Sequence, residues 1–343
     1  MNKHYIGCML GVLLLGACSP SRNWQFETDY LRVELNDKGY ITSMQNRTVS
    51  PQREFSPVDK PSPLLSIYNE ETKQYVLPES AAFDASNKTV TLTYPNQVKA
   101  EVRLEEKGKY LRMELLSLSP REQVDAIQWG TYHTNITNLF GEIIGVARDT
   151  SDAVNYSIGL LALDDNTLGG TADLEGDIAP FQYVIHTPDK ERYPLPDSLH
   201  EGQVFSLGGN GISDVAFYAH KEPYYRILYG NAAVVDEKGQ ISLNYFSRDR
   251  SKPRQVLYSL IPHMPANIPN HIDVEPLPGV DYIGSSIALW GSPDSTALMD
   301  VIQDIVLKEG LPYPTWRGKW VKDPTAYKPD ILTSGLQYDS IVH

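Results

Sequence analysis

The chain has 343 residues, of which 43 are acidic and 30 are lysine or arginine, so its formal net charge is −13 at pH 7. A chain this acidic repels phosphate backbones, and we therefore expect no nucleic acid partner. Glycine and proline each occur 24 times and tyrosine 21 times, a composition rich in turn formers and aromatic residues that favours an all-β domain.

The first residues carry the features of a secretory leader. A basic start at Lys3 is followed by the nearly unbroken apolar run Ile6–Ala17, and the sequence Leu-Gly-Ala-Cys ends at Cys18. This pattern resembles a bacterial lipoprotein signal peptide with its lipobox. The resemblance implies that the thiol of Cys18 takes a diacylglycerol, that residues 1–17 are removed, and that the mature chain begins at Cys18.

An uncleaved transmembrane anchor is the alternative, but the apolar run is much shorter than the roughly twenty residues that cross a bilayer. Cys8 has no apolar stretch before it, so we expect it to be lost with the leader, leaving no disulfide and no thiolate metal cluster. Residues 18–29 are then a tether. Ser19–Asn23 lacks the aspartate that resembles an inner-membrane retention signal and the acidic cluster that resembles the surface-export tag of Bacteroidota. We therefore expect attachment to the cell envelope, at the periplasmic face of the outer membrane.

Beyond the tether, short segments of alternating apolar and polar residues are separated by turn formers. Segment 30–35 has its apolar residues on one face, and Asn36–Gly39 turns the chain into 40–44, which predicts a β-hairpin. Segments 141–147 and 156–163 are more continuously apolar, which predicts central strands covered on both faces. The predicted strands in chain order are 30–35, 40–44, 90–94, 98–104, 110–118, 141–147, 156–163, 204–207, 214–220, 225–229, 240–246 and 255–260.

Two further segments break this pattern. Residues 166–197 are rich in turn formers and predict a long loop over one mouth of the sandwich, either functional or a solvated insertion. Near the end, Ser292 is expected as a helix N-cap, with Pro293 at the first helical position and Asp294 complementing the helix dipole. Apolar residues then recur at helical spacing until Gly310 ends the helix.

Several peptides carry a resemblance to a known fold family. Leu31–Met44 resembles the opening hairpin of galactose-mutarotase-like supersandwich domains, which precede the catalytic barrel in several groups of glycoside hydrolases. Gly141–Asp149 and Ile158–Gly170 are similar to segments of large carbohydrate-active proteins of Bacteroidota. In such proteins a linking helix and a segment like Glu309–Pro314 lead into a (β/α)₈ barrel.

The sequence therefore predicts an all-β fold, with a large antiparallel β-sandwich of the supersandwich type over residues 30–290. A linking helix over 291–310 and an irregular tail over 311–343 follow. The tail is too short for a further domain with its own core. The resemblance leaves two interpretations of it, a loosely held end or the truncated start of a barrel.

Two histidines have aromatic neighbours in the sequence. The mutarotase-like site that the resemblance implies needs a histidine acid and a glutamate base that reach one sugar ring, with aromatic faces stacked on the sugar. The alternative is that the aromatic residues close a core and the histidines are only hydrogen-bonded. The candidate carbohydrate-binding residues are Trp129, Tyr132, His133, His220, Tyr224 and Tyr225.

One acidic loop is a candidate for calcium. Asp173, Glu175 and Asp177 alternate in a turn-rich segment, a spacing that a calcium loop can use. The glutamate that closes an EF-hand loop is missing, so a solvated acidic loop is the alternative. We expect no other cofactor.

No complete catalytic constellation is visible in the sequence. Hydrolysis of a glycosidic bond needs two suitably spaced carboxyl groups. Glu142 and Asp149 flank an apolar segment at an odd separation, which places them on opposite faces of a strand and favours surface or turn roles. The sequence contains neither Gly-x-Ser-x-Gly nor His-Glu-x-x-His. Whether the chain is an enzyme therefore stays open.

The leading hypothesis is a lipid-anchored, carbohydrate-associated β-sandwich that binds or positions a glycan. Its expected partners are a polysaccharide or oligosaccharide and, through the lipid, a membrane. One alternative is a sugar epimerase or remnant glycosidase that acts on its own. Another is a structural envelope lipoprotein.

Overall fold

The structure of the chain is a computed structural model. It describes residues 23–141, 144–149, 155–173, 232–236, 238–257, 271–274 and 276–311, with the short segments 182–184, 204–206, 224–226, 315–316 and 319–320 and the positions 197 and 200. The leader with Cys18 and most of the segment 174–231 lie outside the described residues.

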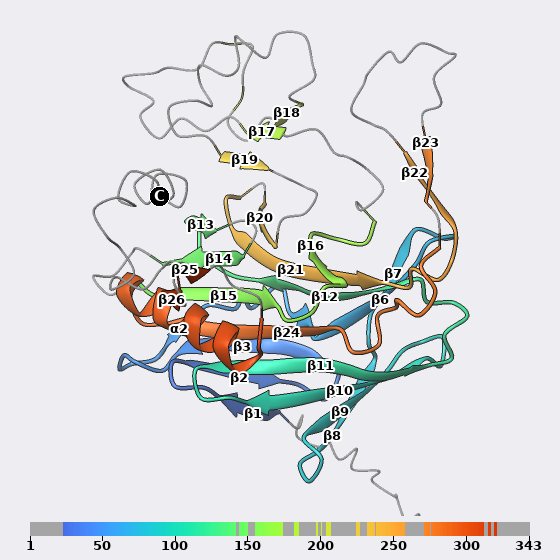
Figure 1. Ribbon diagram of the computed structural model, residues 1–343. Coiled ribbons are helices and arrows are strands. Elements are labelled where there is room, and N and C mark those ends of the chain that lie inside the picture. Colours follow the sequence, from blue (N-terminus) through green and yellow to red (C-terminus); the bar gives the residue numbers. More distant parts are fainter. Residues whose placement is uncertain are drawn as a thin grey trace, which may run out of the picture.

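The largest sheet is antiparallel and has eight strands (Figure 1). They are β8 (Ser80–Asp84), β9 (Thr89–Thr93), β10 (Lys99–Glu106), β11 (Tyr110–Ser119), β13 (Leu139–Gly141), β14 (Gly145–Arg148), β15 (Ser157–Ala162) and β24 (Ser286–Ser292). Their spatial order is β13-β14-β15-β24-β11-β10-β9-β8. The last long strand of the described residues, β24, is therefore inserted between β15 and β11 and joins the two halves of the sheet.

The second sheet has six strands and carries the candidate site described below. They are β6 (Leu65–Asn69), β7 (Gln74–Val76), β12 (Ala126–His133), β16 (Thr167–Gly169), β20 (Ala233–Val235) and β21 (Ile241–Arg248). The order is β16-β21-β12-β6-β7, and β20 also pairs with β21.

A third, five-stranded sheet comes from the N-terminal part of the described chain. Its strands are β1 (Trp24–Glu27), β2 (Leu31–Leu35), β3 (Tyr40–Asn46), β4 (Arg53–Glu54) and β5 (Ser62–Pro63). Three small sheets complete the strand list: β17 (Gln182–Val184) with β18 (Val204–Ser206) and β19 (Tyr224–Arg226), β22 (Arg254–Leu257) with β23 (His271–Val274), and β25 (Thr315–Trp316) with β26 (Lys319–Trp320).

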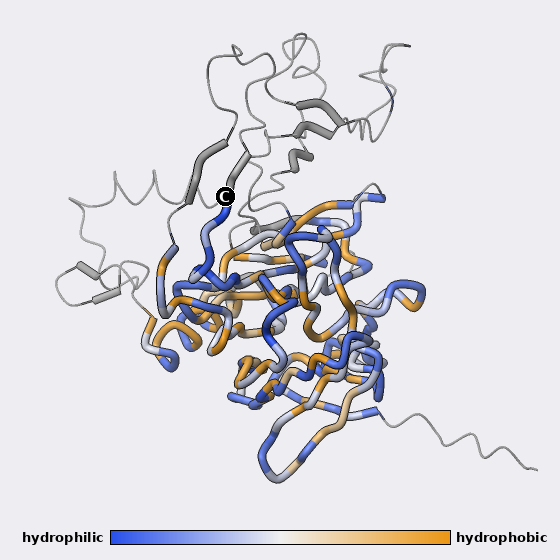
Figure 2. Tube along the Cα trace, turned by 90° about the vertical axis from the view of Figure 1, so that its right-hand side faces the viewer, coloured by the Kyte–Doolittle hydropathy of each residue, from blue (hydrophilic) through white to orange (hydrophobic). Residues whose placement is uncertain are grey.

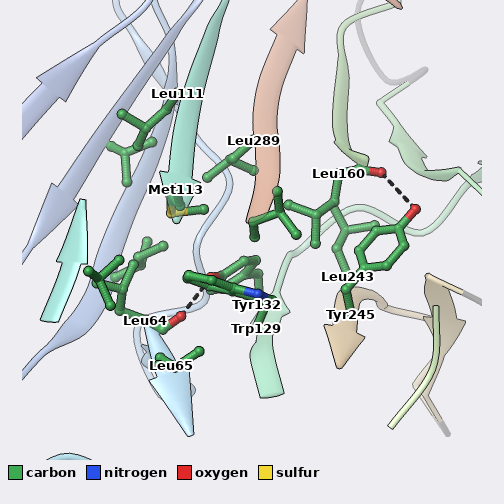
Figure 3. Packing of buried hydrophobic residues seen from close by; sticks show 14 of the residues in the cluster. Leu64, Leu65, Leu111, Met113, Trp129, Tyr132, Leu160, Leu243, Tyr245 and Leu289 are labelled. Carbon is green, nitrogen blue, oxygen red and sulfur yellow. Dashed lines mark hydrogen bonds between the residues drawn. The ribbon is translucent and has the colours of Figure 1, made fainter. Parts of the chain in front are cut away.

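One hydrophobic core joins the three large sheets. Leu289 of β24, Leu243 of β21 and Val33 of β2 are all at most 2% exposed and belong to the same cluster. Figure 3 shows the part of this core between the eight-stranded and six-stranded sheets. In Figure 2 hydrophobic stretches lie within the stacked strands, and many of the turns that project from them are hydrophilic. The predicted antiparallel all-β sandwich is confirmed.

The predicted C-terminal helix is also present, as α2 (Ser295–Lys308). Its N-cap is Asp294, because the Asp294 carboxylate accepts a 2.8 Å hydrogen bond from the N–H of Ala297. Ser292, the expected cap, is instead the last residue of β24, where it pairs with Ser157. Gly310 ends the helix with a φ of +68°, as expected.

Helix α2 covers the face of the eight-stranded sheet that points away from the main core. Leu298 and Val301 of α2 pack with Trp290 of β24 in a second buried cluster. Trp290 lies across Gly159, where an added Cβ would be 1.8 Å from the indole ring. The strands β15 and β24 are therefore covered on both faces, which explains the continuously apolar sequence of residues 156–163.

Three predicted segments differ in the structure. The first sheet begins at Trp24, inside the segment 18–29 that the sequence predicts as a tether, because Phe26 of β1 is buried. The single strand predicted for 141–147 is the hairpin β13 and β14. The strand predicted for 214–220 and most of the tail 311–343 lie outside the described residues.

A bulge in β12 decides which side chains enter the core. The pairing of β12 with β21 shifts between Trp129 and Tyr132, so both residues face inward although three positions separate them. Gly130 lies in the bulge with a φ of +88°, and an added Cβ would be 2.6 Å from the nitrogen of Tyr132 and 2.7 Å from the oxygen of Leu243. The next side chain, His133, is therefore directed to the opposite face.

We predict that Gly130→Ala destabilises the chain by about 3 kcal/mol or more, because it combines an unfavourable φ with two backbone clashes. Gly239→Ala is the matched control, since Gly239 has a φ of +77° but nothing within 4 Å of an added Cβ. The control should lose only about 1 to 2 kcal/mol. Equal losses in denaturant unfolding would contradict the assigned role of the bulge.

Candidate functional site

Two of the predicted sugar-binding residues, Trp129 and Tyr132, lie in the hydrophobic core. Both are 0% exposed. The indole N–H of Trp129 donates to Ser285 Oγ at 2.8 Å. The hydroxyl of Tyr132 donates to the carbonyl oxygen of Leu64 at 2.7 Å (Figure 3). Their ring faces are covered by core side chains, so stacking on a sugar is wrong for these two residues. The alternative interpretation, that they close the core, is correct.

The third candidate, His133, is on the other side of the same strand. It is half-buried, its backbone N–H donates to Ser62 Oγ at 2.8 Å, and its ring Nδ1 is 2.9 Å from Ser242 Oγ. Within the part of the chain that the structure describes, its Nε2 has no hydrogen-bond partner. The structure thus separates His133 from Trp129 and Tyr132.

The structure does not test the three remaining candidate residues. His220 lies outside the described residues, and Tyr224 and Tyr225 are described only as backbone of β19. Their predicted role stays a prediction.

The face on which His133 lies is the outer face of the six-stranded sheet, and it carries polar side chains beside a small buried apolar cluster of Tyr68, Ala126, Ala172 and Phe246. Along β21 the residues Ile241, Leu243 and Tyr245 belong to the core, and the residues between them point the other way. Polar side chains of β6, β12 and β21 occupy this outer face, and most are less than 9% exposed. They are Ser66, Gln128, His133, Ser242, Asn244 and Arg248.

At one end of this face is a group that we call the His133 cluster, consisting of His133, Ser242, Ser62, Lys60 and Asp236. Lys60 Nζ and Asp236 Oδ2 form a 3.0 Å ion pair in which both side chains are about one-third exposed or less. The other carboxylate oxygen of Asp236 accepts hydrogen bonds from the backbone N–H groups of the turn that follows, at 2.8 and 2.9 Å. The Asp236 side chain is therefore held in one orientation by the backbone of the turn that follows it.

The charges of this cluster favour an ionised aspartate and a neutral histidine. Burial opposes ionisation of Asp236, but the Lys60 ammonium and the N–H groups of Gln240 and Lys238 outweigh it, so its pKa is lowered. Burial also lowers the pKa of His133, and Lys60 lowers it further against the opposite effect of Asp236. The imidazole is then uncharged at neutral pH.

At the other end of the face is the Arg248 cluster, consisting of Arg248, Glu70, Tyr68, Tyr75 and Asp173. Arg248 is 3% exposed and donates to Glu70 at 2.9 Å and to the carbonyl oxygen of Ala172 at 2.7 Å. The hydroxyl of Tyr75 donates to Asp173 at 2.6 Å. Burial, with the nearby carboxylates of Glu70 and Asp173, raises the pKa of Tyr68 to about 12.

Between the two clusters, amide side chains hold a short segment of chain against the sheet. Asn244 and Gln128 both donate to the carbonyl oxygen of Gly170, at 2.8 and 3.2 Å. The N–H of Ala172 in turn donates to Gln128 at 3.2 Å. These two amides are therefore used to fix the segment 170–173.

The acidic residues singled out in the sequence are only partly described by the structure. Asp173 binds Tyr75, and Glu175 and Asp177 lie outside the described residues, so the predicted calcium loop is not tested. Among the described residues, no group of three or more His, Cys, Asp or Glu side chains could hold a metal ion. Asp149 is 8% exposed and forms a 2.9 Å ion pair with Arg53, a structural role.

Sequence reasoning missed Lys60, Asp236 and Ser242. Lys60 and Asp236 are 176 positions apart, and no local sequence pattern links one to the other. The available signal was the alternation Ile-Ser-Leu-Asn-Tyr-Phe-Ser-Arg of β21, which assigns serine and asparagine to the face opposite the core.

The comparisons with known proteins identify no family for the chain. No family model matches the chain, and no curated protein matches its sequence. Among solved structures, a polysaccharide lyase is similar over 82% of this chain and 35% of its own length, with a TM-score of 0.35 and 9% sequence identity. The chain thus spans about a third of the length of that protein, and a likeness this low has no bearing on function.

A search of the described residues for membrane-spanning helices found none of sufficient length and hydropathy.

The environment of His133 predicts a pH dependence of stability. Because its pKa is below the ordinary 6.5 in the folded chain, the unfolded chain binds more protons as the pH falls below 6.5. The contribution of His133 to stability is therefore complete above that pH and is lost as the pH falls toward the lowered pKa. Denaturant unfolding between about pH 7 and pH 5 should show the wild type losing stability relative to His133→Gln. Parallel pH profiles would rule out this environment.

Proposed function

We propose that this chain is a carbohydrate-associated β-sandwich that binds a glycan on the outer face of its six-stranded sheet. The observation that carries the proposal is the two-faced character of β21. Its inner residues Ile241, Leu243 and Tyr245 complete the core, whereas Ser242 and Asn244 between them present a hydroxyl and an amide to the opposite face.

The side chains of this face suit a hydroxyl-rich ligand. Hydroxyl, amide and imidazole groups both donate and accept hydrogen bonds without carrying charge, as sugar hydroxyls do. Ser66, His133 and Ser242 are all of this kind, whereas the amides of Gln128 and Asn244 already bind Gly170.

The lowered pKa of His133 is the reason for proposing binding in place of epimerisation. A neutral imidazole is a weak proton donor at neutral pH, whereas the acid of a mutarotase-like reaction must deliver a proton to the sugar. The same neutral ring is well suited to hydrogen-bond a hydroxyl group.

The binding proposal is tested with the full-length chain in detergent micelles, applied to an array of plant and host polysaccharides. We expect retention on at least one neutral polysaccharide and a rise in melting temperature with its soluble oligosaccharide, because a ligand that binds only the folded state stabilises it. The control is the heat-unfolded chain in the same micelles. No retention on any polysaccharide, with an unchanged melting temperature throughout, would favour a structural envelope protein and end the proposal.

We further propose that the chain is anchored in the cell envelope by lipid on Cys18, at the periplasmic face of the outer membrane. The support is the apolar run and the lipobox-like sequence that ends at Cys18. Several acyl chains anchor a protein firmly, because each buried methylene adds about 0.8 kcal/mol.

The anchor predicts that cells expressing the chain incorporate radiolabelled palmitate into it and that the label disappears in Cys18→Ala. Cys8→Ala is the matched control and should keep the label, because Cys8 lies in the segment expected to be removed. Label that persists in Cys18→Ala, or that is lost in Cys8→Ala, would refute lipidation at Cys18.

A further inference from the structure

We propose that the His133 cluster is a subsite for an uncharged sugar unit, in which Lys60, Asp236 and His133 hydrogen-bond neighbouring hydroxyl groups. This inference rests on the proposed glycan-binding function and names both the part of the outer face that binds and the class of sugar bound.

The strand pairing places these residues on one surface. His133 of β12 is opposite Ser242 of β21, and Ser242 is opposite Val234 of β20. Asp236 follows Val234 by two positions and so continues on the same face. Two strand spacings separate β12 from β20, about 10 Å. His133 and Asp236 thus border one patch of the outer face, and Lys60 reaches it from the loop before β5.

Hydrogen-bonding capacity remains in this patch after the internal contacts are counted. Lys60 has three N–H bonds, and among the described residues its only hydrogen-bond acceptor is Asp236. Asp236 retains one of the roughly four acceptor positions of a carboxylate, on Oδ2, since the other three accept from Lys60 and from two backbone N–H groups. His133 has its Nε2 available in the described part of the chain. By contrast, Gln128 and Asn244 are occupied by Gly170.

The three groups complement the two roles of a sugar hydroxyl. Lys60 donates to a hydroxyl oxygen, and Asp236 accepts the proton of a hydroxyl, so the pair can bind two adjacent hydroxyl groups. His133 adapts to either role, because the Ser242 hydroxyl can donate to Nδ1 or accept from it and so set which proton state Nε2 presents. The backbone bonds to Asp236 fix the geometry before a ligand arrives.

The charge of the cluster selects an uncharged sugar. The Lys60 ammonium and the Asp236 carboxylate cancel, and the lowered pKa of His133 leaves it neutral. A uronate would meet the Asp236 carboxylate and a chain of net charge −13. The subsite therefore favours hexoses or pentoses over uronic acids.

The internal role of the ion pair does not account for this arrangement. Both charged groups are partly exposed, with 32% and 26% of the side chains accessible, and such pairs contribute little to stability. The fixed orientation of Asp236 by two backbone N–H groups is independent of Lys60. A pre-oriented, accessible carboxylate beside a partly unpaired ammonium is what a polar ligand requires.

The test is calorimetric titration of the full-length chain in detergent micelles with galactotetraose, mannotetraose, xylotetraose, cellotetraose and tetragalacturonate. We expect at least one neutral tetrasaccharide to bind and tetragalacturonate not to bind. Lys60→Met, Asp236→Asn and His133→Gln should each raise the Kd of the neutral ligand by about tenfold or more, because each removes one polar contact to a desolvated ligand.

The matched control is Lys238→Met, which removes the same charge from an exposed position in the turn next to Asp236. It should change the Kd by less than about twofold. Far-ultraviolet circular dichroism and melting temperatures establish that each variant is folded. If Lys60→Met does not fold, Lys60→Gln replaces it, because glutamine keeps a polar side chain and removes the charge.

The outcomes separate this inference from the proposed function. If a neutral tetrasaccharide binds the three variants as well as the wild type, the glycan site is elsewhere and the subsite is refuted, while the proposed function stands. Tighter binding of tetragalacturonate also refutes the subsite. If none of the five ligands binds the wild type, the subsite is refuted, and the proposed function is decided by the polysaccharide array.

Discussion

The bulge in β12 is the constraint on which the candidate site depends. In a regular strand, side chains three positions apart lie on opposite faces, so Trp129 and Tyr132 could not both enter the core. The shift in pairing at Gly130 places both of them inside and directs His133 outward. Without the bulge the imidazole would face Leu243 and the rest of the core, and the outer face would have an aromatic ring in its place.

The two faces of the six-stranded sheet have different roles in the structure. On the inner face, Trp129 is also tied to the rest of the sandwich by hydrogen bonds, since its indole N–H donates to Ser285, and Ser285 is bonded to Thr167. These contacts satisfy polar groups that are fully buried, which keeps the core well ordered. On the outer face, Asn244 and Gln128 hold the segment 170–173, while Lys60 and His133 keep hydrogen-bonding capacity that their contacts among the described residues do not use.

Sequence patterns predict the fold well where local chemistry decides it. The hairpin of 30–35 and 40–44 and the helix ending at Gly310 follow from alternation and from capping residues. The cap itself was misplaced at Ser292, because a serine that ends a central strand has the same local sequence as one that starts a helix. Ser292 belongs to the strand because it pairs with Ser157 of the neighbouring strand, a contact that the local sequence does not contain.

The site could be predicted only in part, for the same reason. Aromatic residues beside a histidine suggested a sugar site, and His133 is on the outer face, but the bulge that sends Trp129 and Tyr132 inward depends on backbone pairing with β21. The ion pair of Lys60 and Asp236 joins loops that are 176 positions apart, which no local pattern records. Alternation in β21 was the one signal that marked the outer face.

The most direct test of this account is chemical footprinting of His133 with diethyl pyrocarbonate, read by mass spectrometry on the folded full-length chain. The account predicts that Nε2 of His133 is modified in the free protein and becomes protected when a neutral oligosaccharide saturates the chain. An imidazole that is unreactive in the folded chain, or equally reactive with and without the bound sugar, would contradict it.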